Sequence, residues 1–255
     1  TAANLAGTIV GGEGTDTITI DAGATVAFDT TTFAMSGIEI MDITLANSTV
    51  TITDANLTTN PTFAVTGGTN DTLVVASQST AAAAKTIDGS GVTLSSGSTA
   101  AVTYTGGVGA DTFTGGVVAE TFTHSLGADT HEGGSTGVDT YLVPDGTDGS
   151  TADPDGTGAS GAATGMVINM SSSAVSAATV TGAASKYAAN SITSIAAGEV
   201  VYLYDAAAAT NSSVTDTISG IENFTSSDAA GVEYVVGSTG NNVISTGAGV
   251  DYIVA

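Results

Sequence analysis

Cysteine, arginine and tryptophan are missing from this chain of 255 residues, and lysine occurs only at Lys85 and Lys186. Without cysteine, neither a disulfide nor a thiolate metal site can hold the fold together. The two lysines stand against 25 acidic residues, so the net charge is −23 and most carboxylates need a cation other than a basic side chain. Such a surface repels nucleic acid and anionic lipid, and we expect neither as a partner.

Long apolar runs and a leader peptide are also absent. No uninterrupted apolar segment approaches the roughly 20 residues of a membrane-spanning helix, so we expect no membrane insertion. The opening stretch TAANLAGTIV lacks a basic region followed by an apolar core, and no signal peptide is visible. Because the chain begins at Thr1 rather than at a methionine, we expect it to be a processed piece of a longer protein.

Short alternating apolar runs are what the sequence does contain. Such runs occur at residues 17–20, 50–53 and 200–204, between clusters of Gly, Asn and Asp. Apolar stripes with the period of a helix are hard to find over ten or more residues. The pattern therefore predicts an all-β protein with little helix.

Residues 106–142 divide into four consecutive units, GGVGADTFT, GGVVAETFT, HSLGADTHE and GGSTGVDTYL. They follow the nonapeptide G-G-x-G-x-D-x-U-x, with U large and apolar, which is typical of calcium-binding parallel β-helices. Glycines allow a tight turn that gathers backbone carbonyls, Asp adds an anionic oxygen, and x-U-x forms a short strand with U pointing inward. Two units then complete one turn of a right-handed parallel β-roll, and the oxygen ligands suit Ca²⁺.

Loops on the same edge of such a roll belong to every second unit. We therefore expect Asp111 and Asp129 to face one set of ions, and Glu120 and Asp139 to face the other. The full set of residues predicted to form calcium sites is Gly106, Gly107, Gly109, Asp111, Gly115, Gly116, Glu120, Gly127, Asp129, Gly133, Gly134 and Asp139, with Gly11, Gly12, Gly14 and Asp16 in a separate copy.

Two of the four units depart from the template. Val118 and Glu120 replace the third Gly and the Asp of the second unit, and His124 and Ser125 replace the glycine pair of the third. We expect these sites to be weakened or lost. The only other histidine is His131, and its distance of seven residues from His124 predicts that the two lie apart, as replacements of loop and strand residues without a chemical role.

Further copies are more dispersed. GGEGTDTIT at residues 11–19 is a full match, and TGGTNDTLVV at residues 66–75 is a shortened one. An isolated nonapeptide has no neighbouring loop to complete the coordination of an ion. Asp16 and Asp71 are therefore either calcium ligands or parts of turns that bind no metal, and for Asp251 we favour the turn.

No catalytic constellation can be assembled from the sequence. There is no H-E-x-x-H helix for zinc and no G-x-S-x-G elbow for a nucleophile. Carboxylate pairs for glycoside hydrolysis are conceivable in so acidic a chain, but nothing selects one pair. The stretch PDGTDGSTADPDGTG is either a solvated loop or an extra calcium site. We therefore expect that this protein is not an enzyme.

The motifs together resemble the RTX family, the glycine- and aspartate-rich repeat proteins that Gram-negative type I secretion systems export. Residues 106–142 carry the best match. Residues 215–254 resemble the family's "DT-SGIEN-GS-ND-I-G" passage, and residues 166–182 resemble the strand and linker before it. Residues 35–52 are similar to the "SGIE-MN-T" ladder of RTX-type surface-layer proteins. Asn242 stands where the family has Asp, which puts the C-terminal metal sites in doubt.

The resemblance suggests a division of the chain into regions. These are a β-solenoid-like region rich in Ala, Thr and Ser at residues 1–100, the calcium β-roll at residues 101–144, an Asp/Gly-rich loop at residues 145–165, and a C-terminal β region with degenerate repeats at residues 166–255. The closing DYIVA is similar to the end of type I substrates, and the alternative is a plain final strand.

Two functions remain. The first is a calcium-dependent structural protein of a surface layer, filament or adhesive coat, secreted to the surface of a Gram-negative bacterium. Its expected cofactor is Ca²⁺, and its expected partners are copies of itself and cell-surface polysaccharide. The second is the non-catalytic secretion and folding tail of a larger exported enzyme or toxin.

Overall fold

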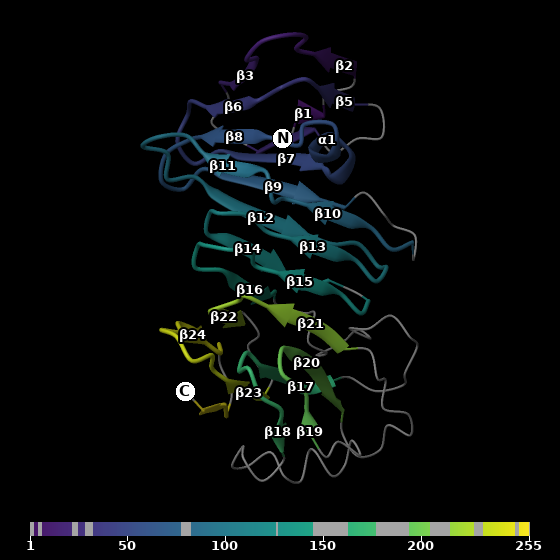
Figure 1. The fold of residues 1–255 in the computed structure, drawn as a ribbon, viewed down its shortest axis with the longest axis vertical. Helices are drawn as coiled ribbons and strands as arrows, with labels where there is room; N and C mark the ends of the chain where they lie inside the picture. Colours follow the sequence, from purple (N-terminus) through teal and green to yellow (C-terminus); the bar gives the residue numbers. More distant parts are fainter. Residues whose placement is uncertain are drawn as a thin grey trace.

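The computed structural model describes residues 3–4, 7–21, 25–28, 33–77, 83–125, 127–144, 163–176, 194–204, 215–226, 232–247 and 250–254. Within these residues the chain forms short strands and a single helix, α1 (Asp54–Thr58), so the expected all-β class is confirmed. The strands stack as successive coils along the long axis of the molecule, from the N-terminal to the C-terminal part (Figure 1).

One sheet extends through almost the whole described chain. Its strands, in spatial order, are β1 (Ala3–Asn4), β4 (Thr25–Phe28), β7 (Thr49–Thr53), β9 (Thr72–Ala76), β12 (Ala101–Thr105), β14 (Glu120–Thr123), β16 (Thr140–Val143), β22 (Asn223–Ser226) and β24 (Ile244–Ser245). All its neighbours are parallel, as in a roll where each coil adds one strand to each sheet.

The remaining strands form four further sheets. The eight-stranded sheet has the order β10 (Thr86–Asp88), β13 (Thr112–Thr114), β15 (Thr130–Glu132), β21 (Thr215–Ser219), β20 (Glu199–Tyr204), β17 (Ala163–Asn169), β23 (Val232–Val236) and β25 (Tyr252–Val254). The four-stranded sheet has the order β11 (Val92–Leu94), β8 (Phe63–Thr66), β6 (Ile40–Ile43) and β3 (Thr17–Ile20). Two further pairs are β2 (Gly7–Val10) with β5 (Phe33–Ser36), and β18 (Val175–Ser176) with β19 (Ser194–Ile195).

The strand register in the nonapeptide region is that of two units per coil. Thr112 of β13 pairs with Thr130 of β15, and the neighbouring Asp111 and Asp129 are 18 residues apart. On the other wall Thr121 pairs with Thr140, a separation of 19 residues, because the fourth unit has one residue more. Each strand is short because only the x-U-x part of a unit is extended.

The sheets continue through the composition changes seen in the sequence. β12 pairs with β9 on one side and with β14 on the other, so the change near residue 100 is not a break in the sheet. β16 pairs with β22 across a long intervening segment. The parallel pattern is interrupted at β20, which lies antiparallel between β17 and β21.

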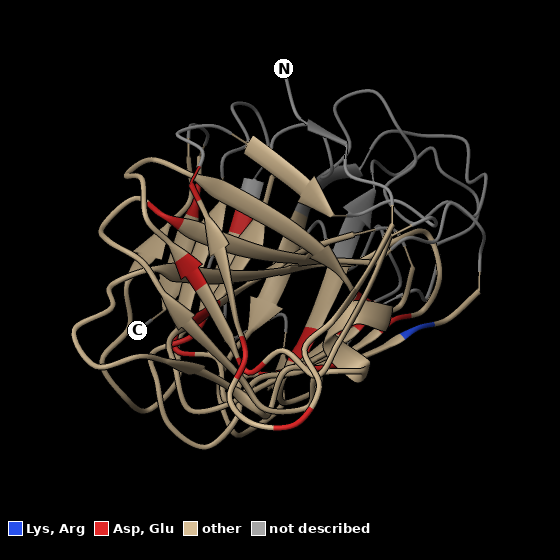
Figure 2. Ribbon diagram, turned by 90° about the horizontal axis from the view of Figure 1, so that it is seen from above, with Lys and Arg blue, Asp and Glu red and all other residues tan. Residues whose placement is uncertain are grey.

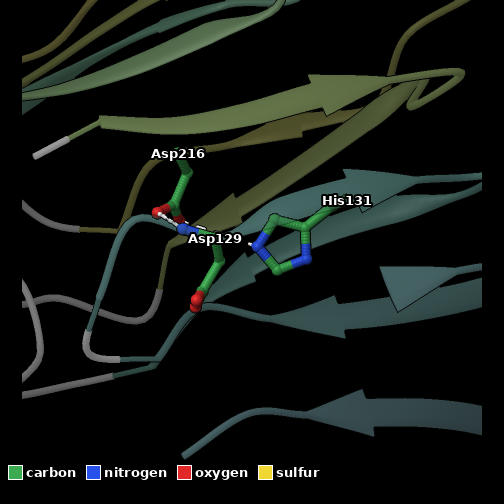
Figure 3. A group of neighbouring side chains, drawn as sticks. All are labelled: Asp129, His131 and Asp216. Atoms are coloured by element: carbon green, nitrogen blue, oxygen red, sulfur yellow. Dashed lines mark hydrogen bonds and ion pairs between the residues drawn. The ribbon is translucent and has the colours of Figure 1, made fainter. Parts of the chain in front are cut away.

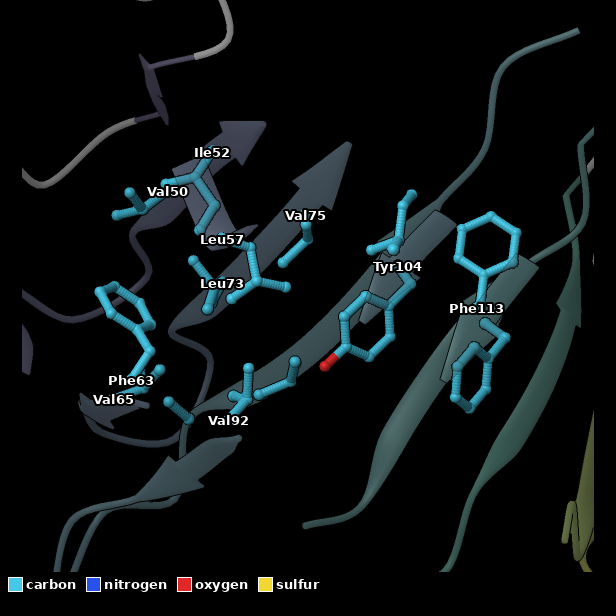
Figure 4. Close-up of a cluster of buried hydrophobic side chains, with 14 of the residues drawn as sticks. Val50, Ile52, Leu57, Phe63, Val65, Leu73, Val75, Val92, Tyr104 and Phe113 are labelled. Atoms are coloured by element: carbon cyan, nitrogen blue, oxygen red, sulfur yellow. The ribbon is translucent and has the colours of Figure 1, made fainter. Parts of the chain in front are cut away.

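The core lies inside the coils and is built from inward-pointing side chains of the short strands, with Leu57 added from α1 (Figure 4). Neighbouring strands of the nine-stranded sheet place their buried side chains in one column, which consists of Val75, Tyr104, Phe122, Tyr141 and Phe224. The Tyr104 and Phe122 rings stack with centroids 5.3 Å apart. Burial of each such side chain stabilises the roll by about 1.5–3 kcal/mol.

Candidate calcium site

The predicted carboxylates lie where loops enter strands. Figure 2, a view along the long axis, shows acidic residues at or near the ends of strands. Asp111, Glu120, Asp129 and Asp139 each stand immediately before or at the first residue of a strand of the roll. Although all four can carry a charge, they are only 1–2% exposed. Such burial requires a compensating partner for each carboxylate.

Along one edge of the roll the carboxylates form a ladder with the backbone. The Asp111 N–H donates to Asp129 Oδ1 at 2.8 Å, and the Asp129 N–H donates to Asp216 Oδ1 at 2.9 Å. At the start of this edge the Lys85 N–H donates to Asp111 Oδ1 at 2.8 Å. Each carboxylate therefore accepts the N–H of the equivalent position in the preceding coil.

The other edge repeats the arrangement. The Glu120 N–H donates to Asp139 Oδ1 at 2.8 Å, and the Asp139 N–H donates to Glu222 Oε2 at 2.9 Å. The structure thus brings Asp111 to Asp129 and Glu120 to Asp139, in the register expected from the nonapeptides. Sequence reasoning missed Asp216 and Glu222, which continue the two ladders from far along the chain.

The second carboxylate oxygen closes the loop of its own unit. The Gly107 N–H donates to Asp111 Oδ2 at 2.7 Å. In the third unit Ser125 stands in place of the second glycine, and its hydroxyl donates to Asp129 Oδ2 at 2.6 Å. A side-chain donor thereby replaces the backbone donor, and the loop retains its closing hydrogen bond despite the departure from the template.

Some carboxylate oxygens lack hydrogen bonds in the described structure. Glu120 Oε2 and Asp16 Oδ2 are buried and have no hydrogen-bond partner. Burial raises the pKa of Glu120, and the neighbouring Asp139 carboxylate adds to the rise. Burial, followed by the charge of Asp216, raises the pKa of Asp129 to about 6. A bound cation would offset both the desolvation and the repulsion between these carboxylates.

Stacked glycines allow the loops of successive coils to approach closely. A Cβ on Gly115 would lie 2.9 Å from Gly133 O and 3.0 Å from Glu120 Oε2. A Cβ on Gly127 would lie 2.3 Å from Gly109 O, and one on Gly134 would lie 2.2 Å from Gly116 O. One on Gly106 would meet Ser125 Oγ at 2.1 Å and Asp111 Oδ2 at 2.9 Å. Carbonyl and carboxylate oxygens therefore line the loops, a donor set that fits Ca²⁺.

We expect Gly133→Ala to lower the free energy of unfolding of the calcium-loaded protein by about 1–3 kcal/mol, as overpacking commonly does. The added Cβ would lie 2.1 Å from Gly220 O, a backbone atom, and 2.6 Å from Asp139 Oδ2. Gly68→Ala is the matched control, because its Cβ would meet only Asp71 Oδ2 at 3.5 Å. Denaturant titration of both variants measures the difference, and equal losses would contradict the proposed loop stacking.

The copy at residues 11–16 has a neighbouring loop after all, contrary to the expectation that it is isolated. Its neighbour is the segment SGIE at residues 36–39. The Asp16 N–H donates to Glu39 Oε2 at 2.9 Å, and the Gly11 N–H donates to Ser36 O at 3.0 Å. Gly12 and Gly14 of the same loop adopt positive φ angles of 110° and 117°.

A second SGIE segment, at residues 219–222, makes the same contacts with the loop of the fourth unit. The Gly133 N–H donates to Ser219 O at 2.8 Å, and Glu222 accepts the Asp139 N–H. Gly220 has a φ of 62°, which matches the 63° of the glycine at position 37. The repeated SGIE is the feature of the sequence that could have revealed both ladder glutamates.

The more degenerate positions retain structural contacts. Asp71 is buried and accepts the Ser48 N–H at 2.9 Å, so it belongs to a ladder. Asp251 accepts the Glu233 N–H at 3.3 Å. The Asn242 amide donates to Glu222 O at 2.7 Å. The acidic positions of the loop that begins at residue 145 lie outside the described residues.

The two histidines lie close together, and the expectation that they lie apart is wrong. His124 Nδ1 lies 2.9 Å and His131 Nε2 lies 3.6 Å from Asp216 Oδ2. Burial raises the pKa of Asp216, but the two imidazoles outweigh this effect and hold it well below its usual range. The common partner of the two histidines is Asp216, which lies 87 residues beyond Asp129 in the sequence. The spacing of seven residues between the histidines therefore did not reveal that they meet.

These features define a parallel β-roll with carboxylate-lined, calcium-type loops. Residues 229–255 match the family model of the RTX calcium-binding nonapeptide repeat (4 copies), so the chain carries repeats of the RTX family. The match lies on the C-terminal units and not on residues 106–142. None of the curated proteins or solved structures compared with the chain matches it.

The nonapeptide repeats of this family bind calcium, and their β-roll is typically a non-catalytic element. RTX repeats are typical of secreted proteins. In the described part of the chain, the single helix has 5 residues, and no helix there is long and apolar enough to cross a membrane.

Proposed function

We propose that this protein is a calcium-dependent, self-assembling structural protein of the extracellular surface of a Gram-negative bacterium, exported by type I secretion. The observation that carries this proposal is the nine-stranded sheet from β1 to β24, which makes the described chain one long roll. A roll of this kind is suited to a layer, filament or adhesive matrix, and self-association through its ends or sides needs no catalytic site.

Calcium supplies the charge compensation in this proposal. The ligands are the carboxylates of Asp111 and Asp129 on one edge and of Glu120 and Asp139 on the other, together with carbonyl oxygens of the glycine-rich loops. The unpartnered oxygens at Glu120 and Asp16 support this assignment, because a buried anionic oxygen without a hydrogen bond requires a cation or a proton.

The second candidate is the secretion and folding tail of a larger exported enzyme or toxin. The family match at residues 229–255 favours it, because those repeats lie at the C-terminal end of the described roll. There β25 pairs with β23 as an edge strand of its sheet. A tail of this type would fold with Ca²⁺ and remain monomeric.

We expect the protein to form filaments or sheets in millimolar Ca²⁺ that electron microscopy resolves, and to disperse in EGTA. Coil ends carry unpaired strand edges, and exposed apolar side chains such as Val243, Val250 and Ile253 lie near one end. Contacts that do not close produce open polymers. Deletion of residues 1–10 or 251–255 should weaken assembly.

Light scattering provides the decisive comparison. A monomer at high protein concentration in millimolar Ca²⁺, with an intact β circular dichroism spectrum, would contradict self-assembly and support the secretion tail. Mg²⁺ at the same concentration serves as the control, because its stricter octahedral geometry does not suit loops of this type.

A further inference from the structure

A buried polar cluster lies inside the roll where the third nonapeptide unit meets β21. It consists of Asp129, His131 and Asp216, which are 0–1% exposed (Figure 3). Asp129 comes from the loop before β15, His131 from the middle of β15, and Asp216 from β21. Each residue offers one ligand atom, and the three atoms lie within 4.8 Å of one another.

His131 occupies a position that the roll otherwise gives to apolar side chains. Its neighbours in the register of the eight-stranded sheet are Phe113 and Ile218, and Ile87 precedes Phe113 in the same column. The His131 ring stacks on Phe113 with centroids 4.8 Å apart and an interplanar angle of 5°. Because the neighbouring coils place apolar side chains here, packing alone does not require an imidazole.

A second observation that points to a ligand concerns the two ring nitrogens of His131. Both Nδ1 and Nε2 are buried and have no hydrogen-bond partner in the described structure. Nε2 lies 3.6 Å from Asp216 Oδ2, which is longer than a hydrogen bond. Two ligands on a tetrahedral metal with bonds of about 2.1 Å lie roughly 3.4 Å apart, so this separation is close to that of a metal-bound pair.

Neighbouring groups hold the two carboxylates in place. Asp216 Oδ1 accepts the Asp129 N–H, and Asp216 Oδ2 lies 2.9 Å from His124 Nδ1 and 2.5 Å from the Tyr141 hydroxyl. Asp129 Oδ1 accepts the Asp111 N–H at 2.8 Å. Such outer contacts orient ligands at metal centres. Oδ1 of each carboxylate accepts one hydrogen bond and keeps a further lone pair, whereas Asp216 Oδ2 already has two partners.

We propose that Asp129, His131 and Asp216 form a binding site for one divalent transition metal of the Zn²⁺ type, which shares Asp129 with the calcium edge of the roll. One imidazole nitrogen and two carboxylate oxygens suit Zn²⁺, whereas Ca²⁺ prefers six to eight oxygen ligands. The two carboxylates balance the charge of the dication. Because the cluster is closed to solvent, the metal enters as the roll folds.

The experiment refolds the EGTA-treated full chain in excess Ca²⁺ with one equivalent of Zn²⁺, removes unbound metal, and measures retained zinc by mass spectrometry. In parallel, Co²⁺ replaces Zn²⁺, and visible absorption reports its ligand field. The chain has two histidines and no cysteine, so a nitrogen-dependent signal must come from His124 or His131. We expect one bound metal per chain.

His131→Phe removes the ligand and matches the aromatic residues of the neighbouring coils, so it should keep the fold and weaken zinc binding by at least about 10-fold. Asp71→Asn is the matched control, because Asp71 is a buried ladder carboxylate with backbone partners, and it should leave zinc binding unchanged. If His131→Phe fails to fold, Asp216→Asn provides the test, since its amide oxygen can still accept the Asp129 N–H.

Two results would overturn the site. Wild-type protein that retains no more zinc than a folded His131→Phe or Asp216→Asn variant would show that the cluster holds no metal. Co²⁺ absorption that these variants leave unchanged would assign the metal to carboxylates elsewhere. In either case His131 is a neighbour of Asp216 and not a metal ligand.

Discussion

Removal of Ca²⁺ with EGTA should unfold the nonapeptide region of the roll and abolish most of its β circular dichroism. Titration of Ca²⁺ back into the sample should restore the signal cooperatively. We expect a midpoint in the range of about 10⁻⁴ to 10⁻³ M, which is typical of extracellular calcium modules. This is the largest effect that the structure implies, since it concerns the fold of the entire nonapeptide region.

The reason is the burial of charge. In each ladder a carboxylate follows the previous one after a single coil, as for Asp111 and Asp129, and both are nearly inaccessible to water. Backbone N–H groups orient these carboxylates but do not neutralise them. Without a cation the carboxylates must take up protons or separate. Because aromatic residues form only 5% of the chain, apolar burial has limited capacity to oppose that separation.

The control is Mg²⁺ at equal concentration, which should not restore the spectrum. An EGTA-treated protein with an unchanged spectrum and unchanged thermal stability would contradict the calcium assignment altogether. Retention of β signal in the EGTA-treated protein with loss of assembly alone would place calcium between molecules rather than within the roll.

Asp129→Ala should shift the calcium midpoint to higher concentration far more than Asp16→Ala does. Asp129 is 1% exposed, accepts the Asp111 N–H and the Ser125 hydroxyl, and stands between two ladder neighbours. Its loss leaves a buried N–H without an acceptor, at a cost of about 1–3 kcal/mol, in addition to the loss of a ligand. Asp16 is half-buried and has one stacked loop, at residues 36–39.

Asn variants at the same positions separate the two effects. Asp129→Asn keeps an oxygen that accepts the Asp111 N–H but removes the charge, so the remaining shift of the midpoint measures the ligand. The shift is read from circular dichroism during Ca²⁺ titration. If Asp16→Ala moves the midpoint as far as Asp129→Ala, the difference in stacking between the two loops does not control calcium affinity.

Local spacing predicted a large part of the site. In each nonapeptide, six residues form the loop and three form the strand, so the positions of Asp111, Glu120, Asp129 and Asp139 on two edges follow from counting along the chain. Burial of Phe113 and Phe122 follows from the alternation within x-U-x. Such inferences succeed because a roll repeats the same local geometry, and its contacts lie only one or two units away.

The sequence by itself determined the all-β class, the coil length and the ladder carboxylates of the contiguous units. Only the tertiary structure decided which distant segments extend those ladders. Glu39 and Glu222 stack on nonapeptide loops through a shorter turn, and Asp216 joins His124 and His131 from far along the chain. No local period encodes these contacts, because the segments between them vary in length and the partners meet only when the coils stack.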